Sequence, residues 1–364
     1  MFHRYLEPLE DSMTPKHSNF PRVTIVIPAR NEEEHIRECL SSLLEQDYPA
    51  DLLEIVVIDG MSEDRTAQQV QELSTLHPRI KLLPNPRRII PSALNIGIAQ
   101  AEGEIVMRAD AHTRYERDYV RLSVELLQTT DAANVGGVIF PIGRGFIGRV
   151  IAAAVCSPFG IGNAYYRFAR KRMWVDTVAF GCWRKKTLVD LGGYNENYSA
   201  NEDYELNYRL RASGGKILLD PRLKCQYIPR DSLPKIFRQY FSYGLYKVRM
   251  LAQYPESMVL RQAVAPVFVL CLAGSLALSP LTFWPLVLLS VSYLTTGAIF
   301  SQRTDCGRNV FRTLTLLLTY LTIHCAWGIG FLYGMKRFGV PKFHKIYPMK
   351  PVSGPSPAPA HADR

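Results

Sequence analysis

Cysteine pairs are missing from this chain. Its seven cysteines are scattered at positions 39, 156, 182, 225, 271, 306 and 325, with no Cys-x-x-Cys motif. An odd and scattered set fits neither a disulfide framework nor a zinc site, so we expect free thiols in a reducing cytosol. The first twenty residues also lack an apolar core, which argues against a cleavable signal peptide. The folded part is therefore expected to face the cytoplasm.

Negative charge is nearly absent from the last third of the sequence. Residues 258–364 contain ten Lys and Arg but only Asp305 and Asp363, and so carry +8 of the formal net charge of +10. A DNA- or RNA-binding protein would concentrate basic residues on its folded domain, so nucleic acid is excluded as a partner. Basic residues that flank apolar segments are typical of contact with lipid headgroups.

Charged residues are missing altogether from Gln262 to Phe300, about twice the length that one helix needs to cross a bilayer. Ser279-Pro280 divides this run and predicts a hairpin of two helices, near 263–280 and 282–300. A third uncharged segment lies near 313–335. Three crossings would place the basic tail outside, against the positive-inside tendency, so one segment is re-entrant or interfacial and the topology stays open.

Short apolar runs alternate with helical patterns in the first 110 residues. The runs at 23–27, 53–58, 80–83 and 104–107 predict buried strands. Helices are expected between them, at 62–76 and 92–100, with the first one beginning at Asn31, where Glu34 completes a capping-box pattern. This alternation predicts an α/β fold with a mostly parallel sheet and ligands at the carboxyl ends of its strands.

Two later segments combine basic and aromatic residues. Residues 140–172 predict a helix, either at the membrane surface or in an ordinary core with a basic rim. Residues 234–251 are expected at the membrane interface. The predicted organisation is a polar lead (1–21), a cytoplasmic catalytic domain (22–230), an amphipathic interfacial segment (231–258), a transmembrane region (259–336), and a basic, then Pro/Ala-rich tail (337–364).

Four motifs in fixed order resemble one known family. They are "VTIVIPARNEEEHI", "EIVVIDGMSEDRT", "PSALNIGIAQAEGEIVMRADAH" and "GGYNENYSANEDYELNYRLRASGG". Over roughly residues 22 to 250 the chain resembles the family-2 glycosyltransferases of GT-A fold, most of all the membrane-attached glucosyltransferases of succinoglycan-type exopolysaccharide assembly. The resemblance implies a Rossmann-like nucleotide-sugar-binding domain with a mixed, mostly parallel sheet, followed by interfacial helices and a C-terminal α-helical membrane region.

The resemblance also assigns a nucleotide-sugar pocket. Its residues are Pro28, Ala29, Glu32, Asp59, Asn95, Arg108 and Asp110, with Gly97 beside Asn95. Asp59 is implied to meet the uracil or ribose, which a carboxylate at a strand end can do. Taken alone, Asp59-Gly60 would be a turn before a helix.

The metal motif departs from the usual Asp-x-Asp, because Arg108 stands where the family has its first carboxylate. Asp110 is expected to bind the cation, with His112 as a further ligand or an orienting group. Mg²⁺ and Mn²⁺ are both open, and an imidazole ligand would favour Mn²⁺. Arg108 either covers phosphate charge or ends its strand facing outward.

Asp203 is the expected general base, since an inverting transfer needs a carboxylate beside the attacking acceptor hydroxyl. Glu202, Gly181 and Trp183 are assigned to the sugar and acceptor pocket, where the Trp183 ring would stack on a sugar. The alternatives are an acidic helix start that complements the helix dipole and a buried structural tryptophan.

These residues predict an inverting enzyme that moves one sugar, glucose in the first instance, from a UDP-sugar to a polyprenyl-diphosphate-linked saccharide. We expect it at the inner membrane of a bacterium. The Gln-x-x-Arg-Trp motif of processive relatives is missing at Gln239–Tyr243, which favours single addition. A processive polysaccharide synthase of hyaluronan or curdlan type, and a non-catalytic membrane scaffold, remain the alternatives.

Overall fold

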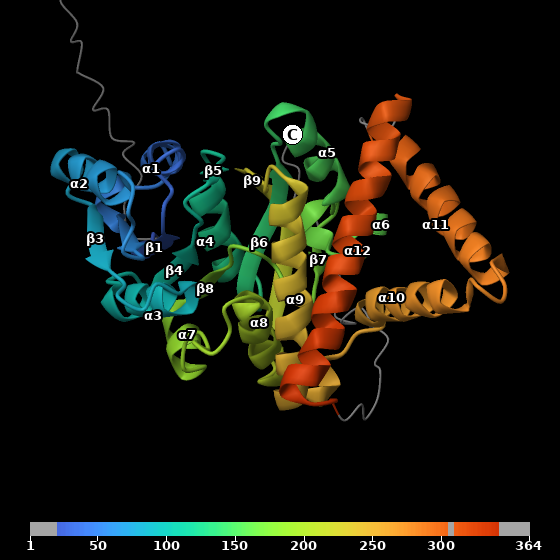
Figure 1. Ribbon diagram of the computed structural model, residues 1–364. Coiled ribbons are helices and arrows are strands. Elements are labelled where there is room, and N and C mark those ends of the chain that lie inside the picture. Colours follow the sequence, from blue (N-terminus) through green and yellow to red (C-terminus); the bar gives the residue numbers. More distant parts are fainter. Residues whose placement is uncertain (1–19, 305–308, 342–364) are drawn as a thin grey trace, which may run out of the picture.

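A computed structural model describes residues 20–304 and 309–341. Its α/β part is built on one sheet of nine strands in the order β3-β2-β1-β4-β8-β6-β9-β5, with β7 paired to β9 (Figure 1). The strands are β1 (Val23–Ala29), β2 (Leu53–Asp59), β3 (Ile80–Pro84), β4 (Ile105–Arg108), β5 (Thr113–Tyr115), β6 (Ala132–Pro141), β7 (Met173–Trp174), β8 (Cys182–Arg184) and β9 (Lys216–Tyr227). The predicted mixed sheet is confirmed; four of its strand pairs are parallel and four are antiparallel.

The first four strands form the parallel half of the sheet. In the register, Ala29 lies beside Asp59, and Val26 lies beside Arg108. The two strands beside β1, which are β2 and β4, run parallel to it and therefore end at the same edge of the sheet. This edge of the sheet brings together residues that lie up to eighty positions apart in the chain.

Helices cover both faces of the sheet, because its strands are apolar on both sides. Ile25 and Val57 pack toward α1 (Ile36–Leu44), α2 (Thr66–Leu76) and α4 (Tyr119–Thr129). Val26 and Val56 pack toward α3 (Ile90–Gln100), α7 (Lys185–Asp190) and α8 (Glu202–Ala212). Short 3₁₀ turns complete this part at η2 (Ala50–Leu52) and η3 (Tyr165–Arg167), and a third, η4 (Pro255–Ser257), lies in the helical part that follows.

The predicted start of the first helix was wrong. The helix begins at Ile36, not at Asn31, and Asn31 takes a left-handed conformation with φ of 54°. Its side-chain oxygen accepts a hydrogen bond from the backbone N–H of Glu63, thirty-two residues away. A tertiary partner has therefore replaced the local capping box.

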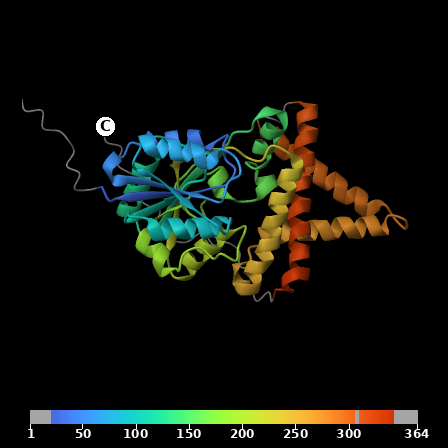
Figure 2. The ribbon, with the colours of Figure 1, turned by 60° about the vertical axis from the view of Figure 1, so that its left-hand side comes forward.

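A second, helical part follows the sheet. It contains α9 (Leu233–Gln253), α10 (Arg261–Leu278), α11 (Trp284–Gln302) and α12 (Val310–Phe338), and α12 also packs against α5 (Gly145–Ala154) and α6 (Pro158–Ile161). The three uncharged segments predicted from the sequence are helices, and within the described residues these three are long and apolar enough to cross a membrane. Figure 2 shows α9 and α12 side by side, with the α10–α11 hairpin on the far side from the sheet.

Candidate functional site

The loops after β1 and β2 lock onto each other at the carboxyl edge of the sheet. Backbone N–H groups of the first loop donate to side chains of the second: Asn31 to Ser62 Oγ (3.0 Å), Glu32 to Thr66 Oγ1 (2.7 Å) and Glu33 to Asp64 Oδ2 (3.1 Å). Paired strands ending in register bring these loops within reach. These hydrogen bonds join the two loops into a rim at the edge of the sheet. Pro28 and Ala29, the last residues of β1, lie at this rim.

Asp59 lies at this rim, 8% exposed. Its carboxylate accepts hydrogen bonds from the backbone N–H of Ser62 (3.1 Å to Oδ2) and from the Ser62 hydroxyl (2.5 Å to Oδ1). This is the turn-forming role that the Asp-Gly pair suggested. A base or ribose contact by Asp59 would have to share a carboxylate that already holds the turn.

Glu32 connects the rim to the metal motif. His112 Nδ1 donates to Glu32 Oε1 at 3.1 Å. Burial acts to lower the pKa of His112, but the hydrogen bond and negative charge of Glu32 outweigh it and raise the pKa above its ordinary value of 6.5. Orientation of a histidine by a carboxylate is the usual way in which a ligating imidazole is fixed.

Arg108 is the centre of the site. It ends β4 with only 6% of its surface exposed, so the outward-facing alternative is wrong. Its Nε donates to Asp110 Oδ1 and its Nη1 to Glu202 Oε1, both at 3.1 Å. These three residues, called here the Arg108 bridge, tie the metal motif to the start of α8, ninety-four residues further along the chain.

Asp203 follows Glu202 on the first turn of α8 and is partly buried. Burial raises its pKa above the ordinary value, the charge of Arg108 opposes this shift, and the charge of Asp110 adds to it. Burial likewise raises the pKa of Glu202 against the charge of Arg108. Asp110 of the metal motif and the Glu202-Asp203 pair at the start of α8 therefore share one electrostatic environment, with Arg108 between them.

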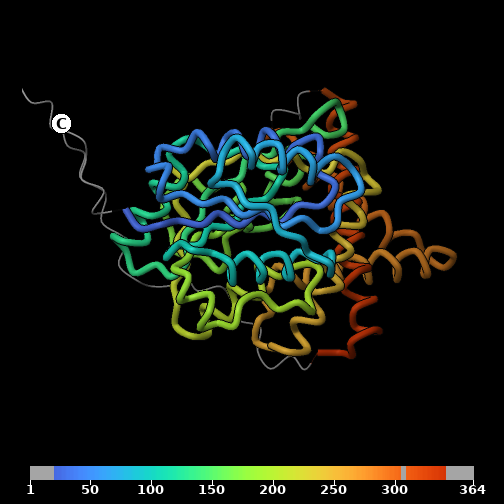
Figure 3. The backbone as a smooth tube through the Cα atoms, turned by 90° about the vertical axis from the view of Figure 1, so that its left-hand side faces the viewer, coloured from blue at the N-terminus to red at the C-terminus, as the bar shows by residue number. Residues whose placement is uncertain are grey.

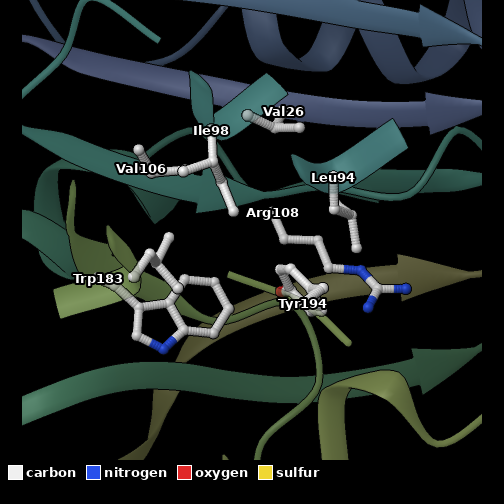
Figure 4. Close-up of a pocket in the computed structure, with 8 residues that line it drawn as sticks. Val26, Leu94, Ile98, Val106, Arg108, Trp183 and Tyr194 are labelled. Carbon is white, nitrogen blue, oxygen red and sulfur yellow. The ribbon is translucent and has the colours of Figure 1, made fainter. Parts of the chain in front are cut away.

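Trp183 is placed in the core. It lies on β8, is 2% exposed, and packs in the cluster beneath α3 and α8. Figure 4 shows Trp183 across a small space from the stem of Arg108 and the ring of Tyr194. The space measures about 10 Å³, far too small for a sugar. This position favours the structural alternative for Trp183.

Gly181 has a packing reason of its own. A Cβ atom there would lie 2.4 Å from both Asn134 Oδ1 and the Trp183 ring. Gly181 also accepts the backbone N–H of Arg108 at 3.0 Å. It thus holds β8 against β4 beneath the Arg108 bridge.

Asn95 makes its contacts with a loop that precedes α8. Its side-chain Nδ2 donates to Tyr194 O and to Glu196 Oε1, both at 2.9 Å, and its Oδ1 accepts the N–H of Tyr194 at 2.7 Å. Gly97, two residues later, lets α3 approach β1 closely, because a Cβ atom there would lie 2.3 Å from Val26. Both residues therefore position neighbouring segments in this structure.

The donor set at Asp110 and His112 suits a divalent cation in part. Because Nδ1 of His112 donates to Glu32, the lone pair of a neutral ring is on Nε2 and can bind a metal. Among the residues that the structure describes, no group of three or more His, Cys, Asp and Glu side chains is arranged to hold a metal ion. A cation here would need further oxygen ligands from a diphosphate or water, as Mg²⁺ sites commonly have.

No motif in the sequence predicted that the start of α8 and the loop before it are hydrogen-bonded to α9. Asn201 Nδ2 donates to Tyr243 O at 2.9 Å, and the Tyr198 hydroxyl donates to Gln253 Oε1 at 3.0 Å. Lys247, buried at 2% exposure, places its Nζ 4.9 Å from the centre of the Tyr204 ring, next to Asp203. The one available signal was Lys247 itself, a charged residue on the apolar side of an amphipathic pattern.

Known proteins resemble this chain in sequence and in fold. The family described as Glycosyl transferase family 2 matches residues 24–187. The succinoglycan biosynthesis protein ExoA of Rhizobium meliloti is 30% identical over 317 residues, which cover 84% of this chain and 93% of ExoA. A dolichyl N-acetyl-alpha-D-glucosaminyl phosphate 3-beta-D-2,3-diacetamido-2,3-dideoxy-beta-D-glucuronosyltransferase of Methanococcus voltae is 29% identical over 63% of this chain and 74% of its own length.

One solved structure shares the architecture. The mannosyltransferase PcManGT from Pyrobaculum calidifontis, in complex with GDP-Man and Mn²⁺, aligns with a TM-score of 0.58 over 85% of this chain and 87% of its own, at 22% identity. At that identity the likeness concerns the fold, and it confirms the GT-A architecture. The similarity to ExoA over most of both chains, together with the family match, shows that this chain is a glycosyltransferase and belongs to glycosyl transferase family 2.

Proposed function

We propose that this enzyme inverts configuration as it moves one sugar, glucose in the first instance, from a UDP-sugar to a polyprenyl-diphosphate-linked saccharide during exopolysaccharide biosynthesis. The Arg108 bridge carries the proposal. It holds Asp110, where a donor diphosphate would bind, and Glu202, beside the expected base, at one buried arginine. Transfer requires donor and acceptor groups within one site, and this contact supplies that proximity.

Asp203 is proposed to act as the general base. Its carboxylate accepts the proton of the acceptor hydroxyl while that oxygen forms a bond to the anomeric carbon. The bond from this carbon to the diphosphate oxygen breaks, and its electron pair leaves with UDP. Burial raises the pKa of Asp203, which makes its carboxylate a stronger base than an exposed aspartate.

Asp110 and His112 are proposed to hold Mg²⁺ or Mn²⁺ together with the donor diphosphate. The cation would neutralise the charge that develops on the leaving group. Glu32 keeps the His112 ring in place. Arg108 is already engaged by two carboxylates, so its proposed role is to position Asp110 and Glu202, with phosphate contact secondary.

The relatives support a lipid-linked acceptor. The name of ExoA places it in succinoglycan biosynthesis, and the name of the Methanococcus voltae enzyme describes transfer to a dolichyl-phosphate-linked sugar. In this chain α8, which carries Asp203, is bonded to α9, and α9 packs against α12. The proposed base is thus attached to the apolar helices. We propose the inner membrane of a bacterium, with residues 22–230 facing the cytoplasm.

The decisive experiment is Asp203→Asn assayed in membranes with radiolabelled UDP-glucose. Losing a general base is expected to lower transfer of label into the organic, lipid-linked fraction by about 10²- to 10⁴-fold. Binding of UDP, measured by calorimetry on the purified protein, is expected to change little. Asp190→Asn is the matched control, because Asp190 is an exposed aspartate paired with Lys186 on α7.

Three outcomes would each contradict a different part of this proposal. Near-normal transfer by Asp203→Asn would refute the assignment of the base. Long aqueous polymer from the unmodified enzyme would point to a processive synthase. If none of UDP-glucose, UDP-galactose and their N-acetyl forms labels the organic fraction, the proposed donor class is wrong.

A further inference from the structure

We propose that only α10 and α11 enter the bilayer, as a hairpin, and that α12 lies along the membrane surface on the side of the α/β part. The partner of this face is a bilayer with anionic headgroups. The proposal concerns how the enzyme meets the membrane, and it holds whichever sugar is transferred.

α12 is long enough to cross. Its 29 residues measure about 43 Å along the axis, against a hydrocarbon core of about 30 Å. Its surroundings differ from those of the other two helices, however. Half of its most apolar window (50%) is buried inside the protein, against 11% for α10 and for α11.

Glycines bring α12 and α9 into backbone contact. A Cβ atom at Gly330 would lie 2.1 Å from Phe241 O, and one at Gly334 would lie 2.9 Å from the Cβ of Val248. Small residues let two helix backbones approach closely, so α9 and α12 pack together as a pair. Figures 1 and 2 show α12 running alongside α9 over the length of α9, with the sheet on the other side of α9.

A crossing α12 would therefore carry α9 into the bilayer with it. Lys235 and Arg238 of α9 are exposed, and placing a charged side chain at the bilayer centre is energetically costly. The loops of the α/β part that adjoin α9 would reach the same depth, where irregular backbone has no hydrogen-bond partners. An α12 that lies in the membrane plane avoids both costs.

The α10–α11 hairpin has the opposite character. Its tip, Ser279–Phe283, points away from the sheet in three views (Figures 1–3). The apolar side chains along both helices are open to the surroundings, for example Leu270 at 57% and Leu288 at 70%. The 18 residues of α10 measure about 27 Å, close to the thickness of the hydrocarbon core.

The free face of α12 suits an interface. A stripe of exposed apolar residues follows it at helical spacing: Phe311, Leu314, Leu318, Ile329 and Tyr333. Basic residues stand at its two ends, Arg312 at the first and Lys336 and Arg337 at the last. An apolar stripe with flanking cations is the pattern of helices that lie in the headgroup region.

This arrangement removes the charge conflict found in the sequence. Two crossings return the chain to the side from which it left, so Arg303, Arg312 and Lys336 all stay on the face of the α/β part. The positive-inside tendency is then satisfied by every basic segment that the structure describes.

Single cysteines in a cysteine-free variant test the proposal with a membrane-impermeant maleimide. Lys186→Cys marks the α/β part, Asn309→Cys and Lys336→Cys mark the two ends of α12, and Thr282→Cys marks the hairpin tip. In inverted bacterial vesicles the variants of the α/β part and of both ends of α12 are expected to react with the maleimide. Thr282→Cys is expected to stay unreacted. In right-side-out vesicles the first three are expected to be protected. Reaction of Asn309→Cys and Lys336→Cys from opposite faces would show that α12 crosses and would overturn the proposal.

Fluorescent-protein and alkaline-phosphatase fusions after Arg364 provide a second measurement that keeps the native cysteines. A fluorescent, phosphatase-inactive C-terminus supports the proposal, and an active phosphatase overturns it. Neither readout uses transferase activity, so a failure here is separate from a failure of the proposed function.

Discussion

The carboxyl edge of the sheet and the pair formed by α9 and α12 hold distant segments together in different ways. At the sheet edge, directional polar contacts do so, as in the Arg108 bridge and the locked loops after β1 and β2. Between α9 and α12, close packing holds the segments together, since glycines let the two backbones touch. Functional groups need a fixed orientation, which hydrogen bonds give, whereas apolar helices in contact with lipid need only a close fit.

Each region also buries one cation, and the two cations have different partners. Arg108 pairs with two carboxylates. Lys247 donates to Ser257 O at 2.8 Å and to Ser257 Oγ at 3.1 Å, which are neutral groups. Burial and then the charge of Arg261 lower the pKa of Lys247 well below its ordinary value. A buried charge is therefore retained at the proposed active site and disfavoured in the helical part.

The largest effect is expected from Arg108→Met. It leaves Asp110 and Glu202 without their shared partner, and breaking a buried pair in this way costs about 3–5 kcal/mol. The free energy of unfolding in detergent, followed by tryptophan fluorescence during urea denaturation, measures the loss. Arg37→Met is the control, because Arg37 pairs with Glu72 at the surface and such a pair contributes at most about 1 kcal/mol. Equal losses for the two variants would show that the bridge does not hold the edge.

Gly330→Ala tests the fit between α9 and α12. The added methyl group would lie against Phe241 O, so we expect a destabilisation of about 1–3 kcal/mol, seen as a lower melting temperature in detergent. Gly274→Ala on α10 is the matched control. Nothing lies within 4 Å of a Cβ atom there, and alanine should leave stability unchanged or raise it by up to about 1 kcal/mol. The same loss at both positions would refute the close contact.

Lys247→Met tests the contrast between the two cations through pH. Because the folded protein lowers the pKa of Lys247, the unfolded chain binds its proton more readily, and stability should rise as pH increases from the lowered pKa toward 10.5. The variant should lose that rise, which amounts to at most about 1.4 kcal/mol per pH unit for one proton. Urea denaturation at several pH values measures it, with Lys186→Met, an exposed lysine, as control. Parallel pH profiles for wild type and Lys247→Met would contradict the assignment.

The smallest effect is expected from Asn95→Ala. It removes the hydrogen bonds to Tyr194 and Glu196, for a net loss of about 1 kcal/mol in stability. UDP affinity, measured by calorimetry, should stay the same, since these contacts hold a loop. Weakened UDP binding at unchanged stability would instead restore the nucleotide contact that the family resemblance implied.

Local pattern determined the element types in the α/β part. Apolar runs predicted β1 to β4, and the uncharged segments predicted the three apolar helices, because periodicity and length report burial directly. Local signals were less dependable at element ends. Asn31 carried a capping pattern, yet it bonds to Glu63, because a partner across the loop competes with the helix for the same oxygen.

The sequence by itself determined the family, the α/β class and the presence of apolar helices, since these depend on the order of motifs and on hydrophobic patterning within short windows. Only the tertiary structure decided that Arg108 faces inward to join Asp110 to Glu202, that Trp183 lies in the core, and that α12 packs along α9. Each of these depends on which surfaces meet after the chain has folded. Which side chain pairs with another ninety residues away, and which helix packs against which, depends on these tertiary contacts. Such contacts leave no periodic pattern in the sequence.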